Sequence, residues 1–149
     1  MEFKYINTEV ERSRNAVIET LREKEHFYKN ILESLTLAIY TCDKYGFITF
    51  FNKAASVLWG REPQAGKDFW TGSWKIYNSN GERLMPEASA MAISMNEGNA
   101  HTGEELIIER PDGTRKKVLS HPHLFFDEEG NVSGGLNVLT EIADSYNLG

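Results

Sequence analysis

The 149-residue chain has little of what several classes of protein need. It holds one cysteine, Cys42, so no disulfide can form within the chain, which fits a reducing compartment. It has no basic excess, because 16 lysines and arginines stand against 22 acidic residues for a net charge of −6. Nucleic-acid binding needs a basic face, so no nucleic-acid partner is expected.

Long apolar runs are also absent. No segment approaches the roughly 18 consecutive apolar residues of a membrane span. The polar start, MEFKYINTEVERSRN, lacks the apolar centre of a signal peptide. The sequence therefore predicts a cytoplasmic domain without a membrane span.

Motifs for catalysis and for metal binding are missing as well. The sequence has no Ser-His-Asp arrangement, no glycine-rich phosphate loop and no paired-carboxylate motif, so an enzyme is not expected. His121 and His123 would share one face of a strand, but no third ligand has a suitable spacing. We therefore expect no metal site, and Cys42 is interpreted as a small core residue.

What the chain does have is enough apolar and aromatic material for one core: 40% hydrophobic residues, with 8 Phe, 6 Tyr and 3 Trp. Its most regular part predicts three strands, over 104–109, 115–123 and 132–140. Polar turns containing glycine separate them, at Pro111-Asp112-Gly113 and at 127–131. Connections this short make the strands antiparallel neighbours, and such a sheet has one face that other elements must cover.

The segments before this meander supply candidates for that cover. Residues 38–42 and 47–51 predict a hairpin, and Asn52 is a good N-cap for a short helix that Gly60 ends. Residues 61–77 follow as an irregular stretch rich in aromatic side chains. A further helix is expected over 87–96, with Pro86 near its start.

The N-terminal segment predicts a long helix over 8–35, with Thr8 and Glu11 matching a capping box. Two rows at heptad spacing are six-eighths apolar or aromatic, which favours a coiled-coil seam and a homodimer. An amphipathic helix packed on its own domain is the alternative, through Ile18, Leu21, Tyr28 and Leu32. The two heptad rows are Val10, Val17, Lys24, Ile31 and Arg14, Leu21, Tyr28, Leu35.

The order of these pieces resembles a PAS domain, from about Ile31 to Ala143. The resemblance implies an α+β fold with a five-stranded antiparallel sheet, in the order 2-1-5-4-3, and helices on one face. The expected domains are an N-terminal helix over 1–35, a PAS domain over 36–143 and a tail over 144–149. The matching residues are Asp43-Lys44-Tyr45-Gly46, Asn52, Ala54-Ala55, Asn80-Gly81, Pro86, Gly98, Arg110-Pro111-Asp112-Gly113, Asp127-Glu128-Glu129-Gly130 and Gly134.

The departures from the family pattern concern cofactors and output. Flavin-binding members carry a cysteine after the position of Asn52, and haem-binding members a histidine on the long helix; this chain has neither there. Neither flavin nor haem is therefore expected. Many PAS domains end in Asp-Ile-Thr, where this chain has Glu141-Ile142-Ala143.

Six residues are candidates for binding an unidentified small ligand. The aromatic and methionine side chains among them are either ordinary cover for the sheet or the wall of a pocket for an apolar or planar molecule. Asn137, within the apolar third strand of the meander, either contacts a ligand or bonds to the backbone. The six are Trp70, Trp74, Tyr77, Met91, Met95 and Asn137.

The resemblance implies a sensory or regulatory domain of a signal-transduction protein, of the histidine kinase (two-component) or cyclic-dinucleotide enzyme type. Such a domain binds a small ligand or relays a signal through dimerisation to an effector kinase or cyclase. A ligand-free dimerisation or adaptor module is the first alternative. An enzyme built on a similar curved sheet is the second, and no motif supports it.

Overall fold

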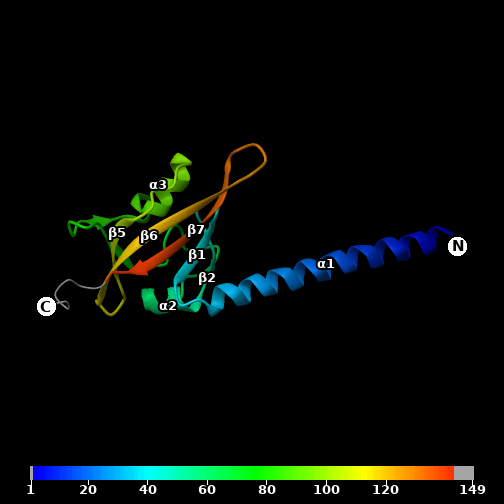
Figure 1. Cartoon of the computed structure of the whole chain (residues 1–149), viewed down its shortest axis with the longest axis horizontal. Coiled ribbons are helices and arrows are strands. Elements are labelled where there is room, and N and C mark those ends of the chain that lie inside the picture. The colour runs from blue at the N-terminus through cyan, green and yellow to red at the C-terminus, as the bar shows by residue number, and fades with distance from the viewer. Residues whose placement is uncertain (1, 143–149) are drawn as a thin grey trace. The chain divides into compact units, whose positions relative to one another are not determined.

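The computed structural model describes residues 2–142, with side chains from Thr8 onward. The chain divides into two units, 1–35 and 36–149. The first holds α1 (Glu2–Ser34), one unbroken helix of 33 residues (Figure 1). The expected capping box at Thr8 is wrong, because α1 begins at Glu2 and no proline or glycine stops it before Thr8. No helix within residues 2–142 is long and apolar enough to cross a membrane.

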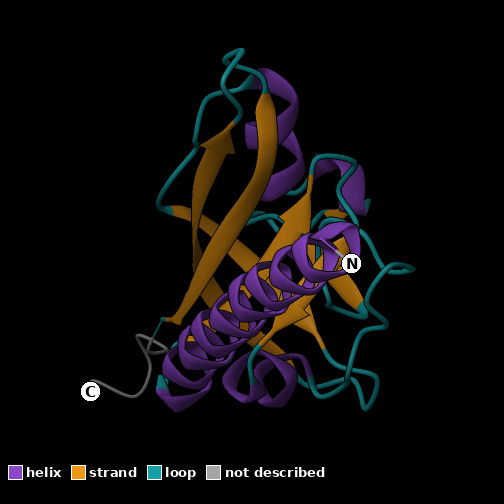
Figure 2. Cartoon of the chain, turned by 90° about the vertical axis from the view of Figure 1, so that its right-hand side faces the viewer, coloured by secondary structure: helices purple, strands orange, loops and turns teal. Residues whose placement is uncertain are grey.

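The second unit is built on one antiparallel sheet, which Figures 1 and 2 show from two sides. The strand order is β2-β1-β7-β6-β5-β3-β4. The α+β class is confirmed, and the first five strands of this order reproduce the expected 2-1-5-4-3. The strands are β1 (Ala38–Asp43), β2 (Ile48–Phe51), β3 (Lys75–Tyr77), β4 (Arg83–Leu84), β5 (Glu104–Glu109), β6 (Arg115–Phe126) and β7 (Val132–Glu141).

The sheet has seven strands instead of five, because β3, at the end of the stretch expected to be irregular, and β4, which follows it, extend the sheet. β3 pairs with β5, with Ile76 opposite Ile108, and β4 folds back on β3. The sequence signal for β3 is only three residues long, and its pairing partner lies about thirty residues later. Nothing local could therefore distinguish this strand from a loop.

Two short helices pack on the sheet. α2 (Lys53–Trp59) begins at Asn52, whose side chain accepts from the Ala55 N–H, and ends at Gly60 in the left-handed conformation. The expected helix over 87–96 is divided in two. A 3-10 turn (Pro86–Ala88) comes first, and α3 (Ala90–Glu97) starts after Ser89, which is extended and caps it.

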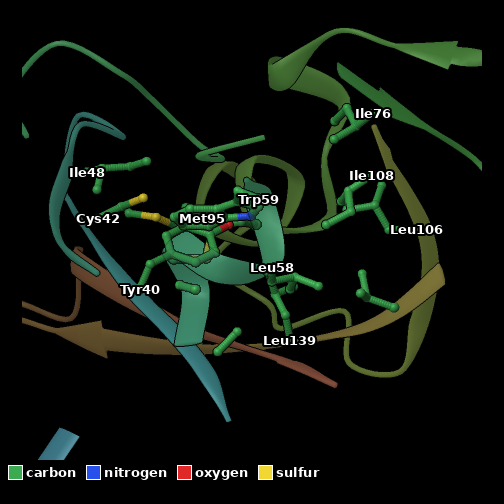
Figure 3. Close-up of a cluster of buried hydrophobic side chains, with 14 of the residues drawn as sticks. Tyr40, Cys42, Ile48, Leu58, Trp59, Ile76, Met95, Leu106, Ile108 and Leu139 are labelled. Atoms are coloured by element: carbon green, nitrogen blue, oxygen red, sulfur yellow. The ribbon is translucent and has the colours of Figure 1, made fainter. Parts of the chain in front are cut away.

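The core lies between these helices and the inner face of the sheet. Inner-face side chains alternate along the strands, as Ala38, Tyr40 and Cys42 do on β1. Figure 3 shows Tyr40, Cys42, Trp59 and Met95 in one cluster with the remaining labelled aliphatic side chains. Trp59, from α2, is fully buried there.

Residues 143–149 lie outside the described part of the chain. The last position of the Glu141-Ile142-Ala143 comparison, the end of the expected PAS domain at 143 and the expected tail over 144–149 fall there.

Candidate functional site

A chain of buried polar groups crosses the inner face of the sheet. Tyr40 on β1 and Asn137 on β7 are direct cross-strand partners, so their side chains point to the same face. The Tyr40 hydroxyl donates to the Trp70 carbonyl over 2.6 Å and accepts from the Asn137 amide over 3.2 Å. We call Trp70 C=O, Tyr40, Asn137 and Ser120 the buried polar chain.

Asn137 is the centre of this chain. Its amide nitrogen also donates to the Ser120 hydroxyl, over 2.9 Å, while its carbonyl oxygen accepts from the His121 backbone N–H over 3.0 Å. Asn137 is 2% exposed and Ser120 is 1% exposed. A buried amide needs such partners, and here protein groups from β1 and β6 supply them.

Burial also sets the charge state of this region. It is the largest cause that raises the pKa of the Tyr40 phenol well above its ordinary value, and the neighbouring Cys42 raises it further. Burial likewise raises the pKa of the Cys42 thiol to about 12, although a hydrogen bond with the Trp70 backbone opposes that shift. Both groups are neutral at pH 7, so the site consists of neutral dipoles in an apolar core.

Trp59 closes the site from the helix side. Its ring meets Tyr40 edge-on, with centroids 5.3 Å apart, and lies so close to Gly72 that a Cβ there would be 2.3 Å from it. The indole N–H is fully buried and has no hydrogen-bond partner in the described part of the chain. Such an unpaired buried donor costs about 1–3 kcal/mol. Among the described residues it is the one buried side-chain nitrogen or oxygen atom without a hydrogen-bond partner.

The structure brings four of the six predicted residues into this region. Met91 and Met95, from α3, are buried over β7, where a Cβ on Gly135 would meet the Met91 methyl at 2.7 Å. Asn137 lies two residues further along the same face of β7. Trp70 joins through its backbone carbonyl, and its indole covers Gly46.

The other two predicted residues lie elsewhere. Trp74 precedes β3 and is 55% exposed. Tyr77 alternates with the buried Ile76 and therefore points to the outer face of the sheet, where its hydroxyl donates to Glu109 and its ring lies under the Arg115 guanidinium at 4.1 Å. That guanidinium also hydrogen-bonds Glu109 and lowers the pKa of its carboxyl.

The roles of Tyr40 and Ser120 were not predicted from the sequence. The available signal was a tyrosine at an inward position of an apolar strand, because a buried tyrosine hydroxyl requires a partner. The identity of that partner depends on strand pairing between residues 97 positions apart. No spacing within the sequence reveals it.

A second buried junction joins α2 to the sheet. The Asn52 carbonyl oxygen accepts from the backbone N–H groups of Ile39 and Ala55, and its amide donates to Leu37 C=O. At the other end of α2, the Arg110 guanidinium donates to the carbonyls of Leu58 and Val57, over 2.9 and 3.2 Å. The helix is thus fixed to the sheet at both ends.

The two strand histidines lie on the outer face of β6. The His121 ring is 3.4 Å from the Thr140 hydroxyl, and His123 packs edge-on against Phe125. Among residues 2–142, no group of three or more histidine, cysteine or acidic side chains is placed to hold a metal ion.

Sequence comparison alone gives no relative, because neither a protein-family model nor a curated protein matches the chain. Solved structures do match. The PAS domain of an HTR-like protein from Haloarcula marismortui is 17% identical, with a TM-score of 0.54 over 86% of this chain and 99% of that one. The light-state LOV domain of the blue-light photoreceptor Aureochrome1 is 16% identical, with a TM-score of 0.55 over 79% and 90%.

A third similar structure is the E. coli DhaR(N)–DhaL complex, at 12% identity and a TM-score of 0.57. The match covers 87% of this chain but only 40% of that one. The strand order of the sheet, the helices on its inner face and the similarity to the PAS and LOV structures all indicate the same fold. The fold of this chain is the PAS fold.

Proposed function

We propose that this chain is a sensory or regulatory PAS module of a signal-transduction protein, of the histidine kinase or cyclic-dinucleotide enzyme type, and that it relays its signal through paired α1 helices. It regulates an effector and does not itself catalyse a reaction. The observation that carries the proposal is α1, because 33 residues make a helix about 50 Å long that ends four residues before β1. The six apolar or aromatic side chains of its two heptad rows are all exposed.

The heptad rows are exposed in the single chain. Val17 is 58% exposed and Leu21 is 60% exposed, and both belong to the heptad rows. A shallow hollow on the helix surface runs between them, lined by these two residues together with Ala16 and Thr20. Apolar residues at heptad spacing are buried when a second helix packs against them, so a second copy of α1 is the proposed partner.

Replacing Val17 and Leu21 together by aspartate tests the dimer. In a dimer the change places four charges in the seam at a cost of several kcal/mol, so light scattering should show monomers where the parent is dimeric. Val57→Asp is the matched control, since Val57 is 61% exposed on α2 and should leave the dimer intact. A parent protein that is monomeric at tens of micromolar contradicts the proposal.

A second function, binding of a small ligand in the core, is favoured by the unpaired indole N–H of Trp59. A ligand with an acceptor group would satisfy that donor, beside the apolar surface of Met91 and Met95. Mass spectrometry of natively purified and then denatured protein tests this. Binding predicts a stoichiometric small molecule that Trp59→Phe loses and Trp74→Phe, at the exposed tryptophan, retains. If no molecule copurifies, the result favours a dimerisation or adaptor module that binds no ligand.

A further inference from the structure

Trp70 has an unusual backbone. It is the one non-glycine residue within residues 2–142 with a positive φ, +69°. The Thr71 N–H donates to the Phe69 carbonyl over 2.8 Å, which closes a γ-turn centred on Trp70. The form of this turn with positive φ is rare and strained, and such strain persists only where the surroundings hold it.

Two contacts hold the Trp70 turn in place. The Trp70 N–H donates to the Gly46 carbonyl over 2.9 Å, and the indole lies directly on Gly46, where a Cβ would come within 2.5 Å of the ring. On the other side, the Trp70 carbonyl accepts the Tyr40 hydroxyl. The strained residue is therefore clamped between the β1–β2 turn and the buried polar chain.

The carbonyl of Trp70 is the link to the sheet. Relaxing φ to negative values rotates the peptide group that carries this carbonyl and withdraws it from Tyr40. The Tyr40 hydroxyl is buried and then needs another acceptor. The nearest one it already touches is Asn137, whose amide would have to turn its oxygen toward Tyr40 and away from the His121 N–H.

We propose that the Trp70 turn is a two-position switch, and that Tyr40 and Asn137 transmit its position to β6. In one position the turn is strained and every group of the buried polar chain is paired as described. In the other the turn is relaxed and the Asn137 amide is reversed. A densely packed core does not deform continuously, so it changes between discrete hydrogen-bond arrangements. Two such arrangements can couple the Trp70 turn to β6. The switch needs only the PAS unit and does not depend on the proposed α1 dimer or on a ligand.

Coupling of this kind works in both directions, so it can be tested from either end. From the sheet end, Ser120→Ala removes a partner of Asn137 without touching the loop. From the loop end, Gly46→Ala places a methyl group in the Trp70 ring. Amide hydrogen exchange measured by NMR reports the distant end in each case, relative to the amide of Ile108 in the core.

The expected result is selective loss of protection at the distant end. Ser120→Ala should raise the exchange of the Trp70 and Thr71 amides, and Gly46→Ala that of the His121 amide, each roughly tenfold relative to Ile108, as loss of one buried hydrogen bond implies. Tyr40→Phe removes the hydroxyl that links Trp70 to Asn137, so it should raise the exchange of the Trp70, Thr71 and His121 amides together.

Two control variants separate switching from general loosening. Val118→Ala truncates a fully buried neighbour on the same strand and face as Ser120, outside the buried polar chain. Gly81→Ala imposes a similar backbone penalty to Gly46→Ala, since φ is +84° against +94°, but its Cβ meets nothing within 4 Å. Exchange ratios at the distant ends should stay at the parental values in both. Unchanged ratios in Ser120→Ala and Gly46→Ala, or equal increases in the controls, overturn the switch even if Tyr40→Phe does not fold.

Discussion

Two buried asparagines join elements of this domain, and they do so in different ways. Asn52 bonds to backbone groups no more than 15 residues away, and it fixes the start of α2 against β1. Asn137 bonds to side chains of β1 and β6, to one backbone group, the His121 N–H, and, through Tyr40, to the strained turn at Trp70. Their exposures are alike, at 0% and 2%, so burial does not distinguish them.

The difference lies in what each asparagine holds. Backbone partners are fixed by the fold and offer one arrangement, so the Asn52 junction is a rigid anchor. Hydroxyl and amide partners can exchange donor and acceptor roles by rotation, so the Asn137 junction has more than one way to satisfy its groups. We therefore expect the first to determine stability and the second to respond to change.

The largest effect is expected for Asn52→Ala. The change leaves the backbone N–H groups of Ile39 and Ala55 without their acceptor and removes the N-cap of α2. Two stranded donors and a lost cap should lower the free energy of unfolding by about 4 kcal/mol, measured by urea denaturation. Asn96→Ala, at an exposed position of α3, should change it by less than about 0.5 kcal/mol. If Asn52→Ala also lowers the free energy of unfolding by less than about 0.5 kcal/mol, Asn52 is not the anchor of α2.

Asn137→Leu should have a smaller effect, about 2–3 kcal/mol in the same measurement. Leucine has nearly the same size and fills the site, and the Tyr40 hydroxyl keeps its Trp70 acceptor. The His121 N–H and the buried Ser120 hydroxyl lose their side-chain partner. If the loss equals or exceeds that of Asn52→Ala, Asn137 is the anchor, and the contrast between the junctions fails.

The same contrast explains what the sequence could predict. Asn52 stands directly before a short helix, so its capping role follows from local spacing, and the structure confirms it. The order of the five main strands followed from a resemblance carried by many such local signals. The Tyr40–Asn137 contact joins residues 97 apart, and β3 exists only because β5 pairs with it. A local pattern carries no information on such distant pairing, so the sequence places Trp74 and Tyr77 among the ligand-binding candidates although the structure separates them from the other four.

Alkaline pH should weaken the domain through Cys42, beside the Asn137 junction. In the folded state the pKa of the buried thiol is about 12, against 9.0 for the ordinary group. The folded state thus keeps a proton that the unfolded chain releases, so the stabilisation is complete below pH 9 and is lost as the pH rises toward 12. The slope is about 1.4 kcal/mol per pH unit.

Urea denaturation at pH 9 and pH 10 in the parent and in Cys42→Ala isolates this contribution. The variant has no thiol, so its unfolding free energy should fall by about 1 kcal/mol less over this interval than that of the parent. The Tyr40 phenol, whose pKa burial also raises, adds a further loss above pH 10 in both proteins. Equal slopes in the two proteins between pH 9 and pH 10 would mean that Cys42 titrates normally in the folded state.

An equally small effect is expected for Arg110→Lys, at the far end of α2 from Asn52. The guanidinium reaches two carbonyls at once, those of Leu58 and Val57, and a single ammonium group cannot reproduce that fork. Charge is retained and Gly60 still ends the helix, so the loss should be about 1 kcal/mol by urea denaturation. Arg83→Lys, on the exposed strand β4, is the matched control and should have no measurable effect. Because α2 is held at both ends, a loss at Arg110 as large as that at Asn52 would show that the C-terminal carbonyls anchor the helix as strongly as Asn52 does, and Asn52 would no longer be its main anchor.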